Sequence, residues 1–178
     1  MDPVPTLQED WLSAERLLVD WRSKAWENQT AHHDAAQYYA NLHYWLGIPA
    51  AILSTIVGTT VFATLQKPSD TNYLKIIPIV VGGISVLSAI FAGLQTFLRL
   101  AERAEQHRAA GAEYSSVRRL LDEIRHLPAA SRGPCKDFLD EIRSRLDQLA
   151  KNSPNVPNRV WRRASTWAQA HAMEEQHN

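Results

Sequence analysis

Hydrophobic and polar positions divide the chain into three parts, and the middle part is almost purely apolar. It contains two uncharged stretches, which run from Trp45 to Leu65 and from Ile76 to Leu98. Neither stretch contains Asp, Glu, Lys, Arg or His. A helix that crosses the hydrocarbon core of a bilayer, about 30 Å thick, needs about 20 mostly apolar residues. The pattern therefore predicts transmembrane helices at 45–65 and 76–98, joined by a short external loop at 66–75.

The segments on both sides show the three-to-four-residue spacing of amphipathic helices. One apolar stripe lies in segment 1–44, and two more follow the second span: Trp11, Ala14, Leu18, Trp21 and Ala25; Tyr114, Val117, Leu121 and Ile124; and Phe138 or Leu139, Ile142, Leu146 and Leu149. We expect these stripes to pack on each other or on neighbouring subunits.

Glycine and proline set the expected ends of the later helices. Neither residue occurs between Gln95 and Ala110, so we expect the second span to continue as one helix over 99–127. Breaks rich in Pro, Gly and Asn then separate further helices at 135–151 and 159–177. The sequence thus predicts an all-α membrane protein, with a transmembrane hairpin, an N-terminal amphipathic helix and C-terminal cytoplasmic helices over 99–178.

Charge indicates the orientation. All 19 Lys+Arg and 19 Asp+Glu lie outside the apolar stretches, and the second stretch is followed by several arginines, among them Arg99, Arg103 and Arg108. The loop carries only Lys67 and Lys75 as basic residues. The positive-inside rule places both termini in the cytoplasm, with the two spans in the plasma (inner) membrane. A net charge of zero gives no reason to expect a nucleic-acid partner.

The second stretch carries polar side chains on one face. At about 100° per residue, five positions fall within about 80° of each other, namely Ser85, Ser88, Ala92, Gln95 and Arg99. Polar groups in hydrocarbon normally face protein or water, so this face is a candidate pore lining. Apolar residues that could close such a path are Ile84, Leu87 and Phe91. Two spans cannot enclose water alone, so a pore requires an oligomer of four or more chains.

Small residues form a stripe on each span, where they let transmembrane helices approach closely. The positions are Gly47, Ala51, Ser54 and Gly58 on the first span, and Gly82, Ala89 and Gly93 on the second. The alternative for the polar and small positions is that they only pack the hairpin, with Ser and Thr hydroxyls bonded to their own helix.

Several landmarks in order resemble one family. They are an LGIP entry and a Ser/Thr-rich first span with GT, then a GLQTF exit and the tail RLAERAEQHRAAGAEYSSVRR, all within about Tyr38 to Leu127. This segment resembles the SLATT superfamily, two-span proteins of bacterial conflict systems. The resemblance implies a membrane-perturbing effector that opens on a danger signal. It also implies a separately encoded nucleotide-signal or other sensor protein, because no sensor domain is fused here.

Outside the two spans, the sequence gives only weak signals for metal-binding or catalytic sites. The run His32, His33 and Asp34 suggests a metal site, but adjacent helical residues point apart, and a solvated face is the stronger interpretation. No Gly-rich phosphate loop, nucleophile elbow or acid–base pair is recognisable, so we expect no enzyme activity, cofactor or metal. A non-conducting membrane anchor for a sensor partner and a small constitutive ion channel remain the alternatives to a defence effector.

Overall fold

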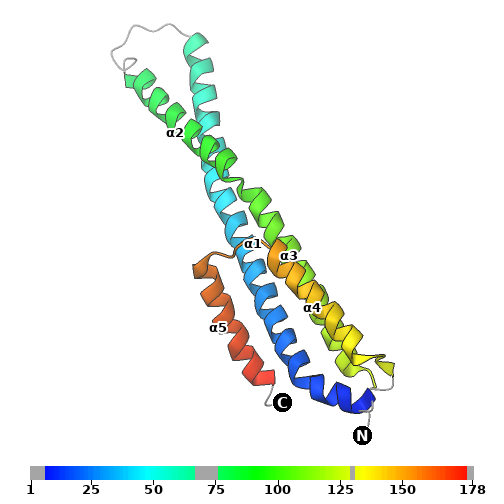
Figure 1. Cartoon of the computed structure of the whole chain (residues 1–178). Helices are drawn as coiled ribbons and strands as arrows, with labels where there is room; N and C mark the ends of the chain where they lie inside the picture. Colours follow the sequence, from blue (N-terminus) through cyan, green and yellow to red (C-terminus); the bar gives the residue numbers. More distant parts are fainter. Residues whose placement is uncertain (1–6, 67–75, 129–130, 176–178) are drawn as a thin grey trace. The chain divides into compact units, whose positions relative to one another are not determined.

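The computed structural model describes residues 7–66, 76–128 and 131–175, which form five α-helices and contain no strand (Figure 1). The helices are α1 (Leu7–Gln66), α2 (Ile76–Leu98), α3 (Leu100–His126), α4 (Cys135–Asn152) and α5 (Asn158–Glu175). The all-helical class expected from the sequence is confirmed for this part of the chain. Most of the predicted loop, residues 67–75, lies outside the described residues.

The first apolar stretch is not a separate helix, because α1 runs from the N-terminal amphipathic segment through residues 45–65. Pro49 lies inside α1 rather than in a first helical turn, where its missing N–H would cost least. Proline inside a helix loses one backbone hydrogen bond, a loss that apolar membrane helices often tolerate. Pro78, by contrast, lies in the first turn of α2.

The expectation of one helix through 99–127 is wrong at a single residue. Helix α2 ends at Leu98, α3 begins at Leu100, and Arg99 between them has a positive φ of 46°. A left-handed residue cannot continue a right-handed helix, so the axis breaks there. The absence of Gly and Pro did not predict a continuous helix correctly here, because the residue that leaves the helical conformation is an arginine.

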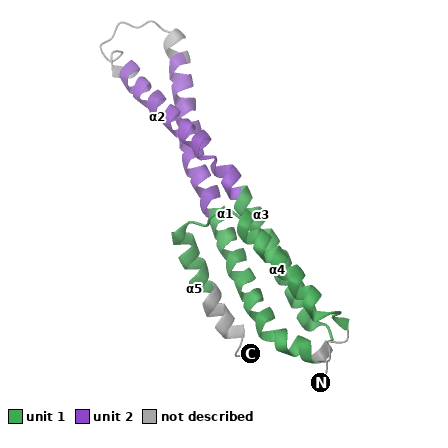
Figure 2. Cartoon of the chain, viewed as in Figure 1, with its two compact units in different colours: residues 1–37, 105–178 green, residues 38–104 purple. Residues whose placement is uncertain are grey.

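The chain forms two compact units (Figure 2). The bundle unit comprises residues 1–37 and 105–178, and the apolar unit comprises residues 38–104. Helices α1 and α3 contribute to both units, α2 lies in the apolar unit, and α4 and α5 lie in the bundle unit.

The core of the bundle unit joins the three stripes predicted from the sequence. Its buried members are Trp11, Ala14, Leu18, Val117, Leu121, Ile124, Cys135 and Ile142. Leu18, Leu121 and Ile142, one from each of α1, α3 and α4, have no exposed surface. Packing of the stripes on each other is therefore confirmed within one chain.

Polar contacts fix the turn that leads into α4. The indole N–H of Trp11 donates to the carbonyl of Gly133 at 3.1 Å, and Gly133 has a φ of 69°. The guanidinium of Arg132 lies 5.4 Å from the centre of the Trp11 ring. The thiol of Cys135 is buried and points to the carbonyl of Asp10 at 3.7 Å. These contacts connect the start of α4 to the start of α1.

Candidate functional site

The apolar unit presents its side chains outward. By length and composition, two helical segments could cross a membrane: Glu9–Val61, within α1, and Pro78–His126, which covers α2 and α3 on either side of Arg99. Only 6% of the most apolar segment of each is buried, whereas the core helix of a soluble protein would be mostly buried. Trp45, Ile79 and Phe97 are each at least three-quarters exposed. Such a surface is suited to lipid or to other apolar helices.

Ser88 joins α2 to α1 inside this unit. The side chain is buried, its hydroxyl donates to the carbonyl of Ala50 at 3.2 Å, and its Oγ lies 2.7 Å from Oγ of Ser54. The hydroxyl of Ser88 therefore has protein partners in a single chain. Hydrogen bonds of this kind between membrane helices contribute about 0.6 kcal/mol on average.

Gln95 makes the second polar contact between these helices. Its amide Nε2 lies 3.3 Å from the carbonyl oxygen and 3.2 Å from Nδ1 of His43. A Cβ added at Gly47 would lie 2.5 Å from this amide, which is too close. Glycine at position 47 therefore makes room for the amide of Gln95.

The predicted pore lining divides into two groups. Ser85, Ser88 and Gln95 are buried or half-buried, whereas Ala92 and Arg99 are exposed, and Arg99 forms an ion pair with Glu102. Among the predicted gate residues, Ile84 and Phe91 are half-buried and Leu87 is exposed. Within one chain, Ser88 and Gln95 therefore contact α1, whereas Ala92 and Arg99 are exposed to the surroundings.

The small-residue stripe of α2 is unused within one chain, whereas Gly47 and Ser54 of the α1 stripe contact α2. Gly47 lies against Gln95, but a Cβ added at Gly58, Gly82 or Gly93 would meet nothing within 4 Å. The other members, Ala51, Ser54 and Ala89, are exposed. Neighbouring hydroxyls are satisfied locally: Thr55 donates to its own helix at the carbonyl of Ala51, 2.9 Å away. Both stripes are therefore free of bulk and of unpaired hydroxyls.

The bundle unit contains a feature that the sequence interpretation missed. His32 on α1 and His107 on α3 are 3% and 2% exposed, and their Nδ1 atoms lie 2.9 Å apart. The His32 ring also stacks on Tyr114, with centroids 5.6 Å apart. Burial, with the neighbouring His107 and His33 as smaller causes, lowers the pKa of His32 from 6.5 to about 4. The expectation that His32 lies on a solvated face is wrong, although His33 and Asp34 are exposed.

This histidine pair has a simple hydrogen-bonding logic. One Nδ1 must carry the hydrogen and the other must accept it, so at least the accepting ring must be neutral. A second proton would place two donors face to face. No group of three or more His, Cys, Asp or Glu able to hold a metal occurs in the described part of the chain.

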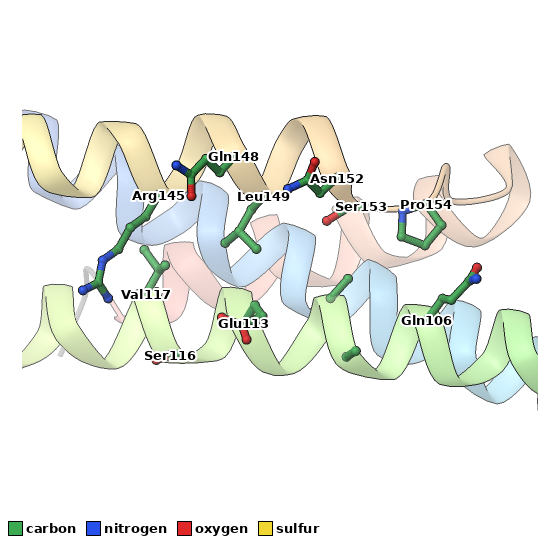
Figure 3. Close-up of a pocket in the computed structure, with 12 residues that line it drawn as sticks. Gln106, Glu113, Ser116, Val117, Arg145, Gln148, Leu149, Asn152, Ser153 and Pro154 are labelled. Carbon is green, nitrogen blue, oxygen red and sulfur yellow. The ribbon is translucent and has the colours of Figure 1, made fainter.

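The bundle unit contains a groove of about 850 Å³ between α3 and α4 (Figure 3). Gln106, Ser116, Gln148 and Asn152 are among its polar lining residues. The ionisable lining residues are Glu113 and Arg145, and Arg145 also pairs with Glu141 at 2.7 Å. The groove offers amides and hydroxyls rather than a paired acid and base.

Comparisons with known proteins add no relative: no protein-family model, curated protein or solved structure matches the chain. The resemblance to the SLATT superfamily rests on the sequence landmarks alone.

Proposed function

We propose that this protein is an oligomeric membrane pore that perturbs the bacterial inner membrane on a danger signal, and so arrests growth or kills the cell in anti-phage or related defence. In this proposal, 45–65 and 76–98 form a transmembrane hairpin with both termini in the cytoplasm. The signal comes from a separately encoded nucleotide-signal or other sensor protein. Enzyme chemistry and nucleic acid play no part.

The observation that carries the proposal is the exposed small-residue stripe of α2, formed by Gly82, Ala89 and Gly93. The contacts of His43 with Gln95 and of Ala50 with Ser88 run in opposite order along α1 and α2. The α1 stripe takes part in this contact, since Gly47 lies against Gln95 and Ser54 against Ser88. At about 100° per residue, the α2 stripe lies about 100° or more round the helix from Ser88 and Gln95 and points away from the contact. A side of small, exposed residues lets a second hairpin approach closely, because membrane helices associate by close van der Waals packing.

The polar face has a divided role in this proposal. Ser88 and Gln95 hold the two spans together through the hydrogen bonds described above. The exposed Ala92, near the inner end of α2, and Arg99, directly after α2, border the path formed by several hairpins. A ring of four or more copies would repeat these positions around one axis.

Orientation has its own test. Single cysteines at Ser69 and at the exposed Lys151 place one thiol in the proposed external loop and one on α4. Charge asymmetry predicts that Ser69→Cys reacts with a membrane-impermeant maleimide in intact spheroplasts, while Lys151→Cys reacts only after lysis. Labelling in the reverse order would contradict the proposed topology.

The decisive experiment combines assembly with conductance. The protein is expressed inducibly in bacteria that carry a membrane-potential dye, with and without the neighbouring genes that supply the signal. Depolarisation is expected in the cells that also express those genes. The purified protein is expected to be a ring of four or more chains by mass photometry in mild detergent. Ala89→Leu fills the small-residue stripe and is expected to abolish both ring and depolarisation.

A matched control adds bulk elsewhere on the same helix. Val80 is 51% exposed and, at about 100° per residue, lies on the face of α2 opposite the stripe, so Val80→Phe is expected to preserve assembly and depolarisation. A wild-type monomer or dimer would remove the pore and favour the membrane-anchor alternative. A ring that forms but never depolarises the cell would also contradict a conducting pore.

A further inference from the structure

Arg99 has an unusual backbone conformation in an otherwise helical segment. Its φ of 46° lies in the left-handed region, which L-residues other than glycine seldom occupy. Helix α2 ends one residue before it and α3 begins one residue after it, and the N–H of Arg103 bonds to the Arg99 carbonyl at 3.0 Å. The first backbone bond of α3 thus starts at the residue that breaks the helix.

Nothing in the local sequence requires this break. The residues around it, TFLRLAER, contain neither Gly nor Pro and are all compatible with a helix. One local feature favours bending: the hydroxyl of Thr96 donates to the carbonyl of Ala92 at 3.1 Å. Hydroxyls that bond back to the preceding turn often bend a helix.

Contacts to α1 on both sides of Arg99 hold the bent form. Before the break, Gln95 bonds to His43. After it, the guanidinium of Arg103 lies 5.9 Å from the centre of the Tyr39 ring, and Leu100 is only 2% exposed. Tyr39 and His43 are one helical turn apart on α1. The bend therefore depends on a few contacts within the apolar unit.

We propose that Arg99 is a hinge at which α2 and α3 exchange between the bent form and one continuous helix. Straightening returns Arg99 to the helical region and restores the hydrogen-bond ladder across residues 98–100. It requires the Gln95–His43 or the Arg103–Tyr39 contact to open. The unfavourable left-handed conformation of Arg99 therefore favours the straight form, and the contacts to α1 favour the bent form. The hinge does not depend on the pore proposed above, since a passive anchor could have the same break.

The test measures the separation of nitroxide labels at two exposed positions in the full-length protein reconstituted in nanodiscs. Val86→Cys labels α2 and Arg108→Cys labels α3. In one continuous helix these positions lie about 33 Å apart along the axis, and a bend shortens the distance. Double electron–electron resonance is expected to show a major short distance and a minor long one.

Substitutions at the hinge are expected to move the populations in opposite directions. Glycine occupies the left-handed region without penalty, so Arg99→Gly should reduce the long-distance fraction by about tenfold. A β-branched residue is strongly disfavoured there, so Arg99→Val should raise that fraction by about tenfold. Arg99→Lys should leave the distribution unchanged.

Ala101→Gly controls for general flexibility, because it places a glycine two residues away in α3. It is expected to broaden the distances without increasing the short population. Identical distributions for Arg99→Gly, Arg99→Val and wild type would overturn the hinge. A distribution for Arg99→Val that keeps only the short distance would do so as well.

Discussion

Lowering the pH from 7.5 to 4 is expected to destabilise the bundle unit by about 3 kcal/mol through His32 alone. Its pKa is about 4 in the folded protein, against 6.5 for an unperturbed imidazole. At pH values between these two, the unfolded chain binds the proton and the folded chain does not. The stabilisation is therefore complete above about pH 6.5, declines as the pH falls, and is lost near pH 4.

Urea unfolding of the protein in detergent, followed by tryptophan fluorescence at several pH values, measures this loss. Carboxylates also titrate near pH 4, so a variant must isolate the imidazole. His32→Phe keeps an aromatic ring beside Tyr114 but carries no titratable group. It is expected to be less stable at pH 7.5, because the hydrogen bond between His107 and His32 is lost, yet to lose less stability on acidification. An unchanged pH dependence in His32→Phe would contradict the assignment.

Truncating Leu121 to alanine is expected to destabilise the bundle unit by about 2–5 kcal/mol. Its side chain is fully buried in the core that α1, α3 and α4 share. Removing three carbons there loses apolar burial and leaves a cavity that Leu18 and Ile142 can fill only in part.

The matched control is Leu12→Ala, the same change at a side chain that is 69% exposed on α1. Surface substitutions of this kind usually change the unfolding free energy by no more than about 0.5 kcal/mol. The shift in urea midpoint gives both values. Equal costs at Leu12 and Leu121 would mean that α3 does not pack in the core as described.

The periodic apolar positions made the bundle core predictable. Trp11, Leu18 and Ala25 recur every seven residues, and each is buried. Seven-residue spacing keeps side chains on one seam of a helix. A strict extension of this series would also have found the histidine pair.

The next position in that series on α1 is His32. On α3, Leu100, His107, Tyr114 and Leu121 follow the same spacing, and all four are buried. The interpretation of His32 as solvated gave weight to its polar side chain and too little to its register. Two neutral imidazoles can share one hydrogen bond, so their burial leaves both facing nitrogens satisfied.

Two other features had no sequence signal. The break at Arg99 lies in a segment without Gly or Pro, and contacts to α1 on both sides of it, Gln95 with His43 and Arg103 with Tyr39, are not visible in the local sequence. The bond between Gln95 and His43 joins residues far apart in sequence, and periodicity within one helix cannot pair them. The polar face of α2 was recognisable from spacing, but its partners were not.

Because Cys135 is buried, we expect it to be unreactive toward thiol reagents in the folded protein. Burial is the main cause that raises the pKa of its thiol, and Asp10 adds to it against the opposing effect of Arg132. The thiolate is the form that reacts with maleimides and disulfides, so at neutral pH this residue is a poor nucleophile. Reporter cysteines can therefore be introduced while Cys135 stays in place, and oxidative cross-links between copies of the protein would identify contacts at the added positions.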